Sequence, residues 1–140
     1  TSKKVYLYEK SIGFYSNISY TAPDYKFDLT KANKVRMKVF VPSYNDYTTV
    51  ADVAGDWIAV NQLQKQVAVK LQNSAAGGSA WETQTEIVKT NLTTDQWIEL
   101  EFDFSEVKDR KDYDKIVIQF GAEGHAAPGI FFFDDFYFGE

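Results

Sequence analysis

The sequence predicts an all-β protein: a single antiparallel β-sandwich of jelly-roll topology that spans residues 1–140. Two observations predict this class. Apolar side chains recur at every second position in several runs, and turn-forming residues separate those runs with no long helical pattern between them. Strands that are joined directly by turns favour an antiparallel sandwich over a βαβ arrangement. The chain has no cysteine, and its length is sufficient to bury a core without disulfides.

The clearest alternation lies in residues 33–42, where Val35, Met37, Val39 and Val41 share one face. The same period of two predicts strands within 65–73, 97–104 and 113–121. Weaker alternation predicts strands at 5–9 and 27–29 and a shorter, more polar strand at 83–90. Segments 31–35 and 105–115 are each expected to hold one helical turn.

The last segment, GIFFFDDFYFGE, combines a dense aromatic run with two adjacent acids, Asp134 and Asp135. It is too short and too charged for a membrane tail, so it predicts the closing strand of the sandwich. We expect Phe132, Phe136 and Phe138 to point into the sandwich. The two acids predict a break in the alternation, either a β-bulge or a calcium site.

Charge and composition argue against several classes of function. The net charge of −5 and the scattered basic residues argue against nucleic-acid binding. No apolar run approaches the roughly 20 residues that a membrane-spanning helix needs, so no membrane span is expected. The chain starts close to its first predicted strand, which indicates either a mature product or an excised module, and we expect the domain to be part of a larger multidomain protein.

Catalytic motifs are absent from the sequence, so we do not expect an enzyme. There is no cysteine and no Gly-x-Ser-x-Gly elbow, and the only histidine, His125, lies in a loop without a partner motif. Glu99, Glu101 and Asp103 alternate on one strand face, and a glycosidase needs two carboxyl groups about 5–9 Å apart. A solvated strand face explains these acids more simply.

Aromatic residues in loops are the most informative side chains. The long irregular stretch at 43–65 contains Tyr44, Tyr47 and Trp57, and Trp81 follows a glycine-rich turn. An exposed aromatic ring offers a flat apolar face on which a sugar ring stacks. The alternative is that these rings fold back over the ends of the sandwich. Trp97, which opens a regular strand, indicates a packing position.

Polar side chains alternate with the predicted core residues. Lys70, Gln72 and Gln119 lie opposite the apolar face of their strands and are candidates for hydrogen bonds to sugar hydroxyls. An ordinary wetted outer face is the alternative for each of them.

The order of segments resembles a known family. NKVRMKVFVPS, VAVKLQN, TDQWIELEFDFS, YDKIVIQFG and IFFFDDFYF are similar to carbohydrate-binding modules of the galactose-binding-like jelly-roll type, over roughly residues 33–138. Such modules occur beside laminarinase-like glycoside hydrolases and in surface glycan-binding proteins of Bacteroidetes. The resemblance therefore implies a secreted or cell-surface bacterial protein.

The resemblance also implies a structural calcium ion. In that family an acid of the final strand binds calcium together with a carboxylate of the N-terminal strand and backbone carbonyls. The matching acids here are Asp134 and Asp135, with Glu9 as the candidate partner. Because neighbouring residues on a strand point to opposite faces, one of the two aspartates is expected to be solvated unless a bulge intervenes.

Together these observations predict non-catalytic binding of a polysaccharide, a β-glucan such as laminarin. Trp57 and Trp81 are the expected stacking platforms, and Tyr44 and Tyr47 are secondary contacts. Two alternatives stay open: a structural or protein-interaction module of a larger secreted protein, and a small glycosidase that uses Glu99 and Glu101.

Overall fold

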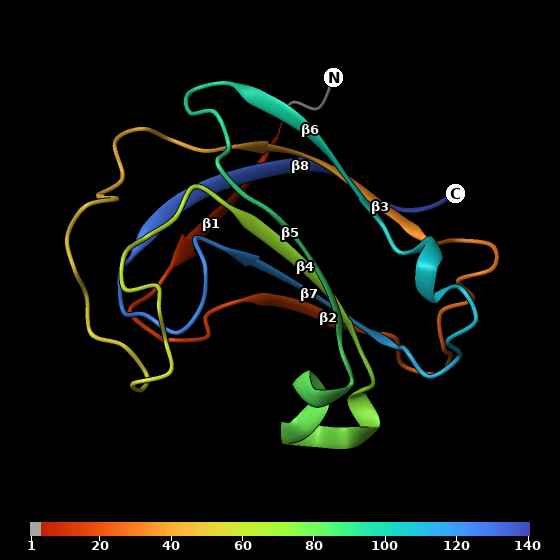
Figure 1. The fold of residues 1–140 in the computed structure, drawn as a ribbon. Coiled ribbons are helices and arrows are strands. Elements are labelled where there is room, and N and C mark those ends of the chain that lie inside the picture. Colours follow the sequence, from red (N-terminus) through yellow and green to blue (C-terminus); the bar gives the residue numbers. More distant parts are fainter. Residues whose placement is uncertain (1–3) are drawn as a thin grey trace.

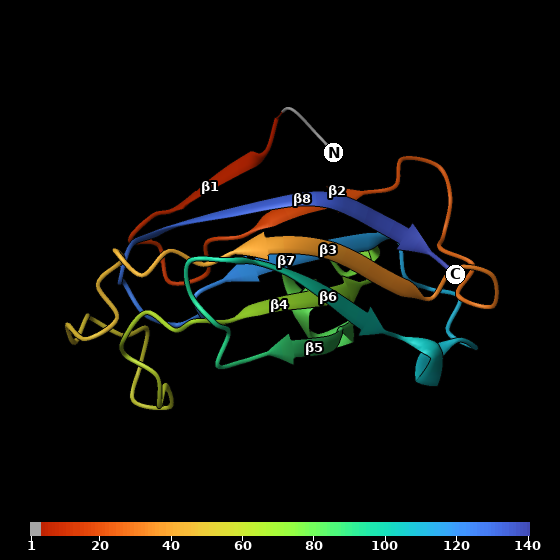
Figure 2. The ribbon, with the colours of Figure 1, turned by 90° about the horizontal axis from the view of Figure 1, so that it is seen from above.

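The protein is a sandwich of two four-stranded antiparallel sheets (Figures 1 and 2). The computed structural model describes residues 4–140. The first sheet has the order β1-β8-β3-β6, and its strands are β1 (Tyr6–Lys10), β8 (Gly129–Gly139), β3 (Lys34–Phe40) and β6 (Trp97–Asp103). The second sheet has the order β2-β7-β4-β5, and its strands are β2 (Ile18–Thr21), β7 (Lys115–Phe120), β4 (Val67–Gln72) and β5 (Thr85–Lys89). This confirms the predicted antiparallel sandwich.

The core lies between the two sheets and contains the alternating residues that the sequence predicts. Val35, Met37 and Val39 of β3 are buried, and Phe120 of β7 stacks on Phe131 of β8 with ring centroids 5.2 Å apart. Side chains at every second position of a strand point to the same face, so each sheet places one apolar face against the other.

Near the N-terminus the strand predicted at 5–9 is confirmed as β1, but the second predicted strand differs from the structure. Residues 27–29 form no strand, although Phe27 still packs on Phe138 with ring centroids 5.1 Å apart. The strand of this region is instead β2, an edge strand whose residues are mostly exposed. An edge strand with little burial carries no clear apolar alternation, so the pattern did not reveal it.

A β-bulge interrupts β8 at the two acids, which confirms the predicted break in alternation. The register between β3 and β8 shifts between Arg36 and Lys38, and Asp135 has a φ of 51°. The extra residue changes which side chains face inward. Phe131 and Phe133 enter the core, whereas Phe132 lies opposite Phe40 on the outer face. The expectation that Phe132 points inward is therefore wrong.

Two irregular segments flank β4. The loop at 41–66 leads into the start of β4, and the 3₁₀ segment η1 (Ser74–Thr83) follows its end. In Figure 1, η1 lies beyond the second sheet on the side away from the first sheet, whereas the 41–66 loop runs down the left end of the sandwich beside both sheets. The second 3₁₀ turn, η2 (Ser105–Val107), lies in one of the two segments that were expected to hold a helical turn. Across residues 4–140 we find no helix that is long and apolar enough to cross a membrane.

Candidate functional site

The outer face of the second sheet carries polar side chains on its central strands. β4 pairs with β5 and β7, so residues that lie opposite one another on these strands form rows across this face. One row contains Glu86, Lys70 and Val117, and the adjoining rows contain Val88, Ala68 and Gln119, and Gln72 with Lys115. We call the polar and charged residues of these rows, together with Glu123 of the loop after β7, the polar face. The three predicted hydrogen-bonding residues, Lys70, Gln72 and Gln119, all belong to it, and all three are buried.

Lys70 lies at the centre of the polar face and forms ion pairs with two carboxylates. Its Nζ lies 3.2 Å from Glu86 Oε2 and 2.9 Å from Glu123 Oε2. The Lys70 side chain is only 4% exposed, whereas the Glu86 and Glu123 side chains are 33% and 41% exposed. The groups that a ligand meets here are therefore the two carboxylates rather than the ammonium group.

Sequence reasoning missed Glu86 and Glu123, because only the strand register and the path of the loop bring them to Lys70. Gln72 is also occupied, since its Nε2 donates a hydrogen bond of 2.9 Å to Gln84 Oε1. The ion pairs of Lys70 and the hydrogen bond of Gln72 fix the positions of these side chains, so they are ordered before any ligand arrives.

Trp57 is 75% exposed in the 41–66 loop. Its ring lies over Gly55, where an added Cβ would come within 2.1 Å of the ring atom Cζ3. Backbone hydrogen bonds hold the surrounding loop, from Ala54 N to Gly124 O at 2.8 Å and from Ile58 N to Gly55 O at 3.0 Å. The loop therefore presents Trp57 to solvent on an anchored backbone.

Trp81 is 62% exposed on η1. Asn73 caps this segment by accepting a hydrogen bond from Ala75 N. Asp114 of the neighbouring strand region accepts hydrogen bonds from Ser74 N at 2.7 Å and Ser74 Oγ at 2.6 Å. These bonds lower the pKa of Asp114 against the opposing effect of its burial. η1 is thus tied to the second sheet while its tryptophan stays in solvent.

The two tryptophans lie in segments at opposite ends of β4. A strand of six residues measures roughly 20 Å. The segments that carry the two rings are thus separated by about the length of this strand, so the rings do not form a single stacked pair.

The two tyrosines of the long loop have different environments. Tyr44 is exposed. Tyr47 is half-buried and packs against the core, and its hydroxyl donates a hydrogen bond of 2.6 Å to Pro42 O. Lys65 Nζ lies 5.1 Å from the centre of the Tyr47 ring. Tyr47 therefore helps to hold the loop, and Tyr44 is the freer of the two rings.

The outer face of the first sheet has a different character. Its β3 and β6 residues form charged rows, in which Arg36 Nε lies 3.0 Å from Glu101 Oε2 and Lys38 lies opposite Glu99. The acids proposed for a glycosidase are thus placed beside cations on a solvated strand face. Trp97 is the first residue of β6 and packs against Phe40 with ring centroids 5.7 Å apart.

The three carboxylates proposed for calcium do not converge. Glu9 lies opposite Ile130 in the β1–β8 ladder, and Asp134 lies four residues further along β8, roughly 13 Å away. Asp135 is paired with Lys38 at 3.1 Å. In residues 4–140, no three side chains of the types His, Cys, Asp and Glu gather as they would around a metal ion. These residues do not fit a calcium site, and calcium stays a prediction from resemblance alone.

A buried lysine occupies the end of β1 beside Glu9. Lys10 is fully buried, and its Nζ donates to Ala127 O at 2.7 Å and reaches His125 O at 3.4 Å and Ser11 O at 3.3 Å. Backbone carbonyls of this kind are also calcium ligands. The cation that joins β1 to the loop after β7 is therefore an ammonium group of the chain itself.

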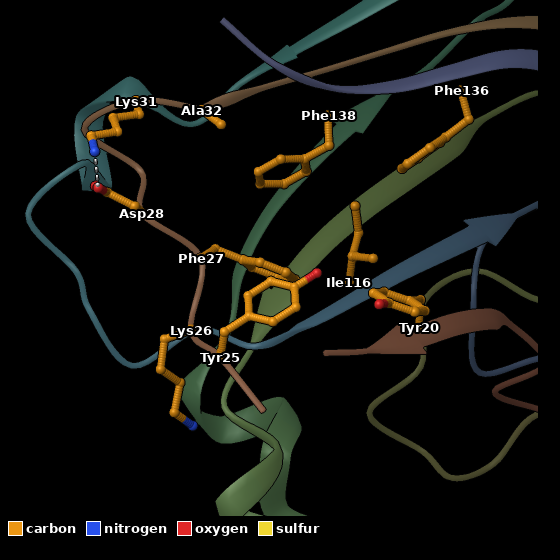
Figure 3. Close-up of a pocket in the computed structure, with 10 residues that line it drawn as sticks. All are labelled: Tyr20, Tyr25, Lys26, Phe27, Asp28, Lys31, Ala32, Ile116, Phe136 and Phe138. Carbon is orange, nitrogen blue, oxygen red and sulfur yellow. Dashed lines mark ion pairs between the residues drawn. The ribbon is translucent and has the colours of Figure 1, made fainter. Parts of the chain in front are cut away.

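A separate cavity opens between the two sheets, between β2 of the second sheet and the second half of β8 in the first sheet. Its volume is about 450 Å³. Figure 3 shows rings from both sheets around it, among them Tyr20, Phe136 and Phe138, with Lys26 and Lys31 at one end. Its lining is mainly apolar and contains no tryptophan.

Comparisons with known proteins gave no relative. No family model matches the chain, and neither a curated protein nor a solved structure matches it.

Proposed function

We propose that the domain binds a polysaccharide, a β-glucan such as laminarin, without cleaving it. The observation that carries this proposal is the pair of exposed tryptophans, Trp57 and Trp81, at the two ends of the polar face. A glycan that runs along this face would stack its sugar rings on the tryptophans and place its hydroxyls over the polar side chains between them.

Energetic considerations also favour a binding module of modest affinity. Exposing a tryptophan to water is unfavourable unless a ligand covers it, and monomeric proteins carry few large apolar surfaces without a role. With two platforms on an open surface, we expect dissociation constants on the order of micromolar to millimolar. The domain would direct a secreted or cell-surface bacterial protein, of which it forms one part, to its glycan.

Affinity electrophoresis and calorimetry against soluble glucans, mannans, xylans and alginates test the proposal. We expect a β-glucan to bind, and we expect Trp57→Ala and Trp81→Ala each to weaken binding about tenfold or more without unfolding the domain. Trp97→Ala is the matched control, because Trp97 is also exposed but lies on the first sheet. A folded domain that binds none of these polysaccharides would rule out the proposal, and normal binding by both loop variants would place the site elsewhere.

A protein-interaction module is the second candidate, and one observation favours it. Leu7, Phe132, Phe40 and Trp97 form one row across the outer face of the first sheet, from β1 to β6. Such a row of apolar side chains is typical of a contact surface. Sedimentation over a range of protein concentrations tests it, because self-association that Trp97→Ser and Leu7→Ser both abolish would favour this role.

A further inference from the structure

We infer that the glycan bound at the polar face is uncharged, and that this surface rejects polysaccharides that carry carboxylates. This inference rests on the proposed function, since it concerns the ligand class of the same site. It comes from the way charge is distributed over the polar face and beside the two tryptophans.

The central cation of the polar face, Lys70, is paired with two carboxylates. Lys70 Nζ is bound by Glu86 at 3.2 Å and by Glu123 at 2.9 Å. One ammonium group with two carboxylates has a net negative charge at neutral pH. Because the ammonium lies beneath and the carboxylates are partly exposed, a ligand meets negative rather than positive charge at the middle of the face.

The surroundings add to this negative charge. Asp56 directly precedes Trp57, and Glu82 directly follows Trp81, so each platform has an acid next to it in the chain. The other cation on the polar face is Lys115. Arg110, which reaches Thr83 O at the end of η1, is paired with Asp112 at 2.8 Å. The polar face itself carries two carboxylates and two ammonium groups, and the two acids that flank the tryptophans in the sequence make carboxylates the majority.

This arrangement suits a neutral sugar for a chemical reason. Ionised carboxylates accept hydrogen bonds but cannot donate them, and sugar hydroxyls are donors that form short, charge-assisted bonds to carboxylates. Glu86 and Glu123 each bind Lys70 through a single oxygen, Oε2. A uronic acid would instead bring a like charge to the same place, which is unfavourable wherever solvent screening is incomplete.

A matched pair of ligands tests the inference, namely laminarin and laminarin whose primary hydroxyls have been oxidised to carboxylates. Calorimetry at low ionic strength should show binding of the neutral polymer and binding at least about tenfold weaker for the oxidised polymer. Added salt should narrow the difference, because it screens the repulsion. Equal or tighter binding of the oxidised polymer, or tight binding of alginate, would overturn the inference while the proposed function stands.

The paired variant Glu86→Gln/Glu123→Gln supplies a second test. It keeps the shape of both side chains and leaves the charge of Lys70 uncompensated, so the discrimination against the oxidised polymer should shrink. An unchanged ratio in a folded variant would contradict the inference. If this variant does not fold, the ratio measured on the unaltered protein still decides. Loss of binding to every polysaccharide, neutral or charged, would instead reject the proposed function itself.

Discussion

Two buried titratable residues, Lys10 and His125, join the end of β1 to the loop after β7. His125 Nδ1 accepts a hydrogen bond from Ala127 N at 3.1 Å, so its other nitrogen, Nε2, carries the proton and donates to Gly121 O at 2.8 Å. The imidazole is therefore neutral in the fold. Burial lowers the pKa of His125 below its usual value of 6.5, and the nearby Lys10 lowers it further.

The neutral state of His125 predicts a loss of stability on mild acidification. Below pH 6.5 the unfolded chain takes up a proton that the folded protein resists, so the free energy of unfolding falls as the pH drops toward the lower pKa of the folded state. The slope approaches about 1.4 kcal/mol per pH unit. Urea unfolding between pH 7 and pH 5 measures it. His125→Gln should remove most of this dependence, and an unchanged slope would contradict the assignment.

The contact between Gly55 and Trp57 gives a second prediction at the scale of one residue. Gly55→Ala should displace the Trp57 ring, because the new Cβ would come within 2.1 Å of Cζ3. We expect altered tryptophan fluorescence and weaker glycan binding, with a stability change of about 1 kcal/mol or less. Gly78→Ala is the control, since a Cβ there meets no atom within 4 Å. Identical fluorescence and affinity in both variants would disprove the contact.

At the scale of the element, β8 shows how a bulge decides which aromatic residues form the core. Phe131 is fully buried against Phe120, whereas its neighbour Phe132 lies on the outer face beside Phe40. Alternation alone does not choose between these two parities when every candidate position is aromatic. Phe131 and Phe138 are an odd number of residues apart, yet both pack on the core side. The extra residue of the bulge at Asp135 makes this possible.

Because Phe131 of β8 faces the core and Phe132 faces outward, we expect substitutions of these two neighbours to lower the free energy of unfolding by different amounts. Phe131→Ala should lower the free energy of unfolding by about 3–5 kcal/mol, because it leaves a cavity in the core. Phe132→Ala should cost about 1 kcal/mol, since it removes only partly exposed surface contacts. Chemical denaturation of both variants measures the difference. Equal costs, or a larger cost for Phe132, would mean that the strand has the opposite face inward.

At the scale of the whole molecule, the proposed binding and folding are linked, because only the folded sandwich holds the segments that carry Trp57 and Trp81 at opposite ends of β4. A ligand that binds only the folded state raises the free energy of unfolding by about 1.4 kcal/mol at ten times its dissociation constant. Laminarin should therefore raise the thermal midpoint of the unaltered protein. The double variant Trp57→Ala/Trp81→Ala should show no rise, and a rise in it equal to that of the parent would mean that the ligand binds elsewhere.

Local patterns were enough to predict the architecture and the exposed rings of the candidate site. The alternation around Val35, Val69 and Ile118 predicts strands with one buried face, because the pleat places every second side chain on the same side. Trp57 and Trp81 were predicted as loop residues from the irregular and glycine-rich stretches around them, and both are exposed. These features depend on neighbours in the chain.

The remaining features depend on contacts between segments that are far apart in the sequence. Lys70 and Glu123 are 53 residues apart, and their pairing follows from the path of the loop after β7. β2 gains its place only by pairing with β7, and Glu9 is separated from Asp134 by the register of β1 on β8. Strand register and loop path are set by packing of the whole sandwich, so no local pattern specifies them. The periodicity of the chain thus establishes a sandwich with tryptophans in its loops, and the folded arrangement decides which charges lie between those tryptophans.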